Sequence, residues 1–232
     1  MLIQWVKSSL LKLIFSIAFL CICPNVVGNS VDSLEQKLAI AKDKKEIILL
    51  HSYIAANYFL TNVDEAIAHC NIALKLSKYI DSDSLQIVCY KCLMIGYENK
   101  PYFEDSAFSF IAPFEALKTA DNYPRLQSET YGAIASVYMR LHEYDKSILY
   151  QQKSVEKAQL TNNNSLIGSA KNNLGDLYRK SGQLDEALAI FKEVVTIGEK
   201  ENNLLLKAQG NRGLGVYYDI KKDFTNAEYY FM

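Results

Sequence analysis

Cysteine and histidine are the residues of this chain whose types could support redox or metal chemistry. Cys89 and Cys92 have the Cys-x-x-Cys spacing of a redox pair or of half a zinc site. A tetrahedral zinc site needs two further ligands, and activated thiolates usually lie at the start of a helix, whereas this pair falls inside a predicted helix. We therefore favour core filling for both cysteines and keep a redox or metal role as the weaker alternative.

The three histidines, His51, His69 and His142, fall in different structural units of the predicted fold, and we expect no shared site among them. Catalysis usually shows as a nucleophile with a base, as paired carboxylates or as clustered metal ligands, and the sequence presents none of these patterns. Gly168 and the stretch Gly213-Leu214-Gly215 follow no predicted strand, as a phosphate-binding loop would require. We expect no enzyme activity, no cofactor and no metal.

Composition narrows the class of protein. The 232 residues include 25 basic and 26 acidic ones, and 50% of the chain is hydrophobic, with only four Pro and ten Gly. This excludes a disordered or collagenous chain. The even charge, with no run of like charges, also indicates no nucleic-acid binding through this segment. The aromatic residues are unevenly divided among the three types, with sixteen Tyr and ten Phe against one Trp. The positions of the Tyr therefore call for a structural explanation.

The first 28 residues have the pattern of a signal peptide. Lys7 and Lys12 precede an apolar run over 13–23, and Val26-Val27-Gly28 offers a small-residue cleavage site, so we expect cleavage after Gly28. The alternative is a membrane anchor, but the run is about half of the roughly 20 residues that a spanning helix needs. We expect an exported protein, periplasmic or in the cell envelope, with no membrane insertion after cleavage.

Cys21 and Cys23 open a second alternative, a lipoprotein. Leu20 and Ile22 stand before them where that signal has a small residue, so we consider it weaker. Cleavage leaves 23 basic and 26 acidic residues. The cysteines that remain, an odd number, imply no full disulfide framework.

The rest of the chain repeats itself with a period of 40 residues. Leu174-Gly175-Asp176-Leu177-Tyr178 aligns with Leu214-Gly215-Val216-Tyr217-Tyr218, and equivalent Tyr recur upstream at similar spacing. Turn and helix-capping residues recur on the same period, and between them apolar residues follow the three-and-four spacing of an amphipathic helix. Each unit is therefore predicted to be a helical hairpin, with about 16 residues, or about 24 Å, in each helix.

At these positions the chain resembles the tetratricopeptide repeat family. The residues that carry the resemblance best are Leu174, Gly175, Tyr178, Gly182, Leu184, Ala187 and Phe191. The unit is longer than the family's usual one, as in other long-period members. The resemblance implies an all-α fold, a right-handed superhelical solenoid of antiparallel helical hairpins, after the N-terminal signal peptide.

The predicted organisation has seven segments. They are the signal peptide at 1–28, a capping helix within 29–46, and five repeats at about 47–80, 84–121, 125–161, 165–201 and 204–232. The last repeat stops inside its second helix, without the polar cap that closes most repeat arrays. We expect either a truncated array that continues in a longer chain or self-association through this uncapped repeat.

Particular residues of the unit have predicted packing roles. Gly175, Gly215 and their counterparts Ala55 and Ala135 should let the two helices of a hairpin approach closely, facing Ala66, Ala187 and Ala227. Met94 at this position predicts a wider crossing in the second repeat. The repeated Tyr, namely Tyr58, Tyr97, Tyr138, Tyr178 and Tyr218, should bury their rings and keep their hydroxyls at the edge, with an aromatic ligand cage as the weaker alternative.

Pro113 predicts a kink or break near Ile111 to Pro113. Inside a helix a proline removes one backbone hydrogen bond and clashes with the preceding turn, which costs about 3 kcal/mol unless the helix bends. A straight helix from Glu104 to Thr119 would contradict this expectation.

The resemblance also implies where a partner binds, because the first helices of the hairpins line the concave face of the superhelix. The polar candidates for this groove are Lys91, Glu98, Glu129, Ser136, Asn172, Asp176, Arg179, Gln209, Arg212 and Asp219. An ordinary solvated face is the alternative for each of them. The carboxylate clamp of chaperone-type adaptors needs a Lys followed four residues later by Asn, and Lys91 is followed by Ile95, so we expect no such clamp.

We therefore predict an exported scaffold that binds a protein or peptide in its concave groove and has no catalysis of its own. The alternative is the periplasmic sensor part of a longer, membrane-anchored signalling or transcription regulator, with a kinase or helix-turn-helix output downstream. A redox or metal protein that uses the Cys-x-x-Cys pair is the weakest of the three.

Overall fold

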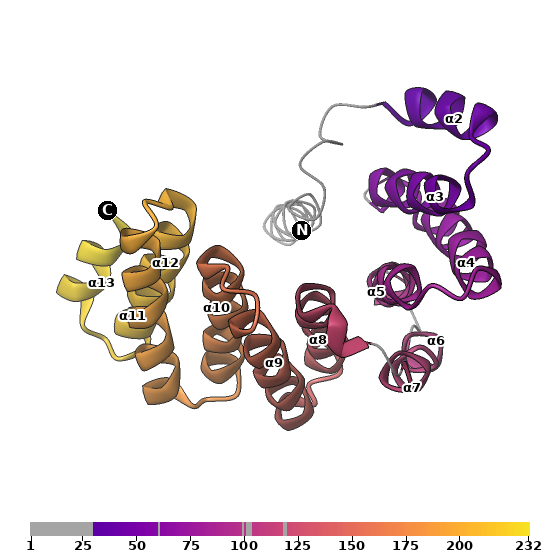
Figure 1. Ribbon diagram of the computed structural model, residues 1–232. Helices are drawn as coiled ribbons and strands as arrows, with labels where there is room; N and C mark the ends of the chain where they lie inside the picture. Colours follow the sequence, from indigo (N-terminus) through magenta and orange to yellow (C-terminus); the bar gives the residue numbers. More distant parts are fainter. Residues whose placement is uncertain (1–29, 60, 99, 101–103, 118–119) are drawn as a thin grey trace. The chain divides into compact units, whose positions relative to one another are not determined.

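The structure is a computed structural model that describes residues 30–59, 61–98, 100, 104–117 and 120–232. The chain divides into two compact units, residues 1–118 and 119–232, and each is described by itself. The predicted signal peptide, 1–28, lies outside the described residues. Within the described ranges every regular element is a helix, and neighbouring helices pack in adjacent pairs (Figure 1). The predicted all-α fold of helical hairpins is confirmed.

Unit 1 begins with a short helix that packs on the first hairpin. Its helices are α2 (Val31–Ile40), α3 (Lys44–Tyr58), α4 (Val63–Tyr79), α5 (Asp83–Glu98), α6 (Glu104–Phe108) and α7 (Ile111–Glu115). Helix α2 lies in the segment predicted to cap the array, and Leu34, 1% exposed, buries itself with Leu50 and Ile54 of α3. The hairpin α3–α4 is followed by α5, which contacts α3, α4, α6 and α7.

Unit 2 contains two full hairpins and a third with a shorter second helix. After a 3-10 turn, η1 (Ala120–Asn122), its helices are α8 (Pro124–Arg140), α9 (Tyr144–Gln159), α10 (Asn164–Lys180), α11 (Leu184–Lys200), α12 (Leu204–Ile220) and α13 (Phe224–Phe231). Each long helix of this unit has 16 or 17 residues, as the period predicted.

The turns explain why the helices begin where they do. Asn62, Asn163 and Asn203 cap α4, α10 and α12, each accepting a hydrogen bond from a backbone N–H three residues on. Helices α4, α9 and α11 also carry acidic residues in their first turns, where the helix dipole favours them. Polar residues at a fixed period therefore fix the ends of the helices.

Small residues let the two helices of a hairpin approach closely, as predicted. A Cβ on Gly175 of α10 would lie 2.8 Å from the Phe191 ring of α11. The same holds one repeat later, where a Cβ on Gly215 would lie 2.6 Å from Phe231. Ala55, Ala66, Ala135, Ala187 and Ala227 are all buried. The predicted wider crossing at Met94 stays a prediction, although its side chain is fully buried.

The five repeated Tyr are all half-buried. Tyr138 stacks on Tyr150 with ring centroids 5.4 Å apart, and Tyr218 stacks on Tyr230 with centroids 5.5 Å apart. In both pairs the second Tyr lies twelve residues after the first, in the second helix of the same hairpin. The Tyr178 hydroxyl accepts a hydrogen bond of 3.0 Å from Nε2 of Gln152 in the preceding hairpin. These rings fill the hairpin edge, which supports the packing role predicted for them.

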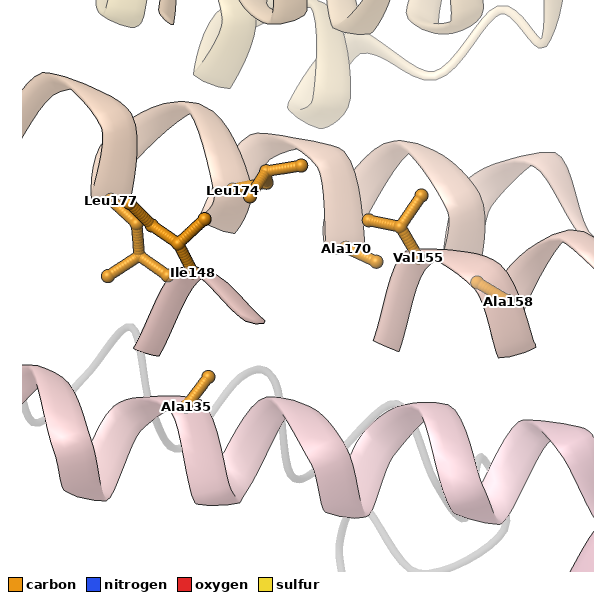
Figure 2. Close-up of a cluster of buried hydrophobic side chains, with 7 residues drawn as sticks. All are labelled: Ala135, Ile148, Val155, Ala158, Ala170, Leu174 and Leu177. Atoms are coloured by element: carbon orange, nitrogen blue, oxygen red, sulfur yellow. The ribbon is translucent and has the colours of Figure 1, made fainter. Parts of the chain in front are cut away.

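The core of unit 2 lies between α8, α9 and α10. Figure 2 shows the cluster, with Ala135 on α8, Ile148, Val155 and Ala158 on α9, and Ala170, Leu174 and Leu177 on α10. Each of these side chains is at most 9% exposed. At about 25 cal/mol per Å² of apolar area buried, contacts of this kind supply the main stabilising term of such helix pairs.

Pro113 lies beside a break in the helix, as predicted. α6 ends at Phe108 and α7 starts at Ile111, so no straight helix runs through this stretch. In a continuous helix, residue 113 would donate its N–H to the carbonyl of residue 109. Proline has no N–H to donate, and the helix is interrupted by a turn at residue 109. Pro113 instead occupies the first turn of α7, where no such donor is needed.

Candidate binding surface

The first helices of unit 2 form its inner layer. Helix α10 contacts both α8 and α12, whereas the second helices α9 and α11 have at most marginal contact with each other. A stack in which one layer of helices is closer together than the other curves toward the closer layer. The side chains of α8, α10 and α12 that point away from their hairpin partners therefore face the concave side of this unit.

A charged cluster joins two of these helices. Oδ1 of Asp176 accepts hydrogen bonds from Arg179, 3.3 Å from Nε and 3.1 Å from Nη2, one turn along α10. Its other oxygen, Oδ2, lies 3.2 Å from Nη2 of Arg212 on α12. Three of the predicted groove residues are thus brought together. The side chains of Asp176 and Arg179 are each 23% exposed, while that of Arg212 is 53% exposed and open to a partner.

Lys180 adds a third cation to this cluster, and it was not among the predicted residues. Its Nζ lies 3.0 Å from Sδ of Met139 on α8, so it bridges the first helices of two hairpins. The pKa of Lys180 is lowered, chiefly by desolvation; Asp176 raises it, while Arg179 and Arg212 lower it further. Asp176 therefore pairs with two arginines and acts on Lys180 only through its charge. The sequence signal was a Lys directly after Arg179 in the last turn of a first helix.

Asn172 lies one turn before Asp176 and is 6% exposed. Its Oδ1 atom has no hydrogen-bond partner among the described residues, and the same is true of Oε1 of Gln127 on α8. Both oxygens lie below the surface, with less than 1 Å² of exposed area each.

The remaining candidates in unit 2 are spread along the first helices. Glu129 pairs with Nε of Arg125 at 3.1 Å, with its side chain 13% exposed. Ser136 and Gln209 are half-buried, and Asp219 is exposed.

Lys91 and Glu98, the candidates in unit 1, are buried, with 2% and 6% exposure, and neither is without a partner. The reason is that α5 is covered by four other helices. They are therefore placed inside the packing of unit 1 rather than on an open face.

Comparison with known proteins assigns the repeat. Residues 126–200 match the family model described as "Tetratricopeptide repeat". These residues are therefore similar to tetratricopeptide repeats. The matched residues include α9, α10, α11 and all of α8 except its first residues. The match therefore covers the helices of the charged cluster except α12. Tetratricopeptide repeats generally act as non-catalytic scaffolds for protein interactions, and this coarse function fits the present fold.

A solved structure shows the same fold over most of the chain. The crystal structure of BtubC (BKLC) from P. vanneervenii matches with a TM-score of 0.74 and 17% sequence identity, covering 86% of this chain and 86% of that one. At this identity the likeness concerns the fold alone. No curated protein matches the chain.

Three cysteines lie in the packing of the helical hairpin α3–α4 and of α5. Cys70, Cys89 and Cys92 are free thiols with no exposed surface. Burial, together with a smaller effect of Cys92, raises the pKa of Cys89 to about 12, although hydrogen bonds with Ser77 and Ser52 act in the opposite direction. Burial also raises the pKa of Cys70 well above its ordinary value. Such thiols remain protonated at neutral pH, which disfavours the redox alternative.

The expectation that the histidines lie in separate units is wrong for two of them. His51 on α3 and His69 on α4 face each other within the first helical hairpin, with their Nδ1 atoms 2.9 Å apart. The mistake lay in the assignment of units, since both residues fall within the repeat predicted at 47–80. His142 lies in the turn between α8 and α9, where its Nδ1 is 3.1 Å from the hydroxyl of Tyr144.

Two further findings concern membrane-spanning helices and metal sites, and both apply to the described residues alone. In that part of the chain, no helix combines the length and the apolar character that crossing a bilayer requires. Across the same ranges, no three or more His, Cys, Asp or Glu side chains are placed to hold a metal ion together.

Proposed function

We propose that this chain is a scaffold that binds a protein or peptide on the first helices of unit 2, through an acidic side chain of the partner. The observation that supports this most is the surplus of positive charge in the cluster of Asp176, Arg179, Lys180 and Arg212. One carboxylate cannot satisfy two guanidinium groups and an ammonium group.

The geometry of the cluster leaves cationic groups available to a partner. Asp176 holds one face of each arginine, which fixes the guanidinium planes and reduces the side-chain entropy that binding must otherwise remove. The donors that remain on Arg212 reach solvent. Hydrogen bonds between charged groups contribute about 1.5–3 kcal/mol each, so one carboxylate of a partner would give useful affinity.

Asn172 lies next to the charges, but it offers no contact to a partner. Its Oδ1 atom has less than 1 Å² of exposed area, so a bound peptide cannot reach this acceptor. The cations therefore define the chemistry of the partner, which is an extended segment with an acidic residue near its centre.

The test uses two labelled peptide sets of equal length and equal aromatic content, one rich in Asp and Glu and the other rich in Lys and Arg. Fluorescence anisotropy with the purified chain should show tighter binding of the acidic set, weakening as salt is added. The double variant Arg179→Gln, Arg212→Gln should lose this preference.

The matched control is Arg125→Gln, which removes an exposed arginine of α8 that pairs with Glu129 away from the cluster. Its affinity for the acidic set should stay unchanged. Equal binding of the two peptide sets, or an equal loss in the control, would contradict the proposed function.

We further propose that the chain is exported to the periplasm or cell envelope. The support is the sequence pattern of residues 1–28, with two lysines before a short apolar run and a small-residue cleavage site. Fractionation of cells that express the full chain, with mass spectrometry of its mature N-terminus, tests the proposal. A mature chain that starts at Asn29 is expected, and a cytoplasmic chain that keeps residues 1–28 would contradict it.

A second candidate function is the sensor part of a longer, membrane-anchored regulator. Exposed apolar side chains on α13 favour it, because Phe224 is 66%, Tyr229 69% and Phe231 55% exposed, and tetratricopeptide arrays usually cover such a face with a further helix. The same face could instead pair with a second copy of the chain. Sequencing of the gene beyond codon 232 tests the sensor candidate, which a stop codon there would contradict.

A further inference from the structure

We propose that His51 and His69 form a binding site for a divalent transition-metal cation of the Ni²⁺ or Cu²⁺ type. Both imidazoles belong to one hairpin, one on α3 and one on α4, and their Nδ1 atoms are 2.9 Å apart. The site is separate from the peptide-binding surface proposed above and does not depend on it, since it lies in the other unit of the chain.

The spacing of the two nitrogens fits adjacent positions of a metal ion. Imidazole nitrogens bind such ions at about 2.0–2.1 Å, so two ligands at a right angle are separated by about 2.9 Å and two tetrahedral ligands by about 3.3 Å. The spacing of His51 and His69 therefore suits square-planar or octahedral coordination, which Cu²⁺ and Ni²⁺ prefer with nitrogen and oxygen ligands.

In the metal-free chain the same two nitrogens share one hydrogen bond, in which one ring is the donor and the other the acceptor. Binding of a metal ion by both Nδ1 atoms requires that the proton of the donor ring moves to its Nε2, so that both rings stay neutral and both Nδ1 lone pairs turn toward one point. The χ2 torsion of histidine is broad, so ring rotation can achieve this without movement of either helix. Water completes the coordination shell, because two imidazoles occupy only two positions.

The surroundings of the pair also suit a cation. Both rings are half-buried, so an ion can reach them from solvent while the hairpin holds them in place. Glu65 lies one turn before His69 on α4, and Glu35 of α2 also acts on His69 electrostatically. The Tyr58 ring lies 6.0 Å from His69 and is influenced by the same two carboxylates and by Asp32. This negative charge compensates that of a bound ion.

Neighbouring thiols do not complete the site. Cys70 follows His69 directly, but its side chain is fully buried against Cys92, whereas His69 is partly exposed. The site is therefore expected to bind through nitrogen and oxygen alone.

The test is a calorimetric titration of the untagged, metal-stripped full chain with Ni²⁺, because a polyhistidine tag would itself bind the ion. One site per chain is expected. His51→Gln and His69→Gln should each weaken binding by at least about tenfold, the smallest loss usual for changes close to a metal. Glu65→Gln should weaken it less. The control is His142→Asn, which removes a histidine far along the chain and suits the left-handed backbone there, with φ 60°.

A measurement on the unchanged chain keeps the proposal testable if a variant fails to fold. Substoichiometric Ni²⁺ should broaden the ring-proton NMR signals of two histidines and leave those of His142 sharp. Any of four results would overturn the proposal: no binding site, unchanged affinity in His51→Gln, loss of binding in His142→Asn, or absorption from sulfur-to-metal charge transfer.

Discussion

The turn residues that follow the first helices of unit 2 adopt the left-handed backbone at a fixed period. His142, Gly182 and Lys222 have φ values of 60°, 86° and 61°. Only glycine adopts this region without strain, while other residues pay about 1–2 kcal/mol there. Gly182 thus fits its turn, and the two residues at the equivalent positions are strained.

Lys222→Gly should therefore stabilise the chain by up to about 1 kcal/mol, the relief of strain minus the entropy that glycine loses on folding. The control is Lys221→Gly, because Lys221 has φ −77° and gains nothing from glycine. Urea unfolding of both variants measures the effect. A Lys222→Gly chain that is no more stable than Lys221→Gly would show that the turn carries no strain.

Burial of Cys89 makes a second residue-scale prediction, concerning pH. In the unfolded chain the Cys89 thiol has its ordinary pKa of 9.0, whereas in the folded chain its pKa is about 12. The native thiol should therefore resist iodoacetamide at pH 8 to 9 and react quickly in urea. The unfolded state loses its proton first, so stability should fall as pH rises above 9. Mass spectrometry of the Cys89 peptide checks the labelling, and equal rates with and without urea would refute the assignment.

The residue scale is also where prediction from sequence was weakest. Asp176, Arg179 and Arg212 were predicted on one surface, and the structure joins them, because residues 36 apart on successive first helices come side by side in a regular repeat. Lys180 was missed, since whether the last residue of a helix turns toward a neighbour depends on its side-chain torsions. His51 and His69 were separated wrongly, although one hairpin contains both.

Elements were predicted better, because the period of 40 residues fixes hairpin lengths and turn positions. The exception is α5, where the polar residues Lys91 and Glu98 were placed on an open face and are buried. Helical periodicity shows which side of a helix is apolar, but not how many neighbours cover it. Helix α5 contacts four others, including the short pair that forms around Pro113, so its polar side chains are enclosed as well.

Close approach within a hairpin gives the element-scale prediction. Gly175→Ala should destabilise the chain, because its Cβ would lie 2.8 Å from the Phe191 ring. Overpacking of this kind costs about 1–3 kcal/mol, more than the roughly 0.5–1 kcal/mol that alanine gains over glycine within a helix. Thermal unfolding measures the loss. A second change, Phe191→Leu, should recover part of it in the Gly175→Ala background.

Gly132→Ala is the matched control for this change. Gly132 also lies in a first helix, but a Cβ there would meet nothing closer than Oγ of Ser154 at 3.6 Å, an ordinary contact. The variant should be more stable than the parent chain because only the helix propensity changes. Equal effects of the two substitutions would mean that hairpin crossing does not depend on the small residue.

At the scale of the whole molecule, stability should vary along the array, because each hairpin is held mainly by its neighbours. In unit 2, helices α10 and α11 pack against elements on both sides, whereas α13 has extensive contact with α12 alone. Amide hydrogen exchange of the full chain should therefore be slowest in α10 and α11 and fastest in α13 among the helices of this unit.

A local perturbation tests whether this coupling is nearest-neighbour in range. Gly215→Ala forces a Cβ to within 2.6 Å of Phe231, so it should loosen α13 from α12 and speed exchange in α13 severalfold. Exchange in α9 should stay unchanged, because the core it shares with α8 and α10 does not involve α13. If exchange in α9 and α13 rises together, unit 2 unfolds as one cooperative block, and the gradient expected of a stack of separate hairpins does not exist.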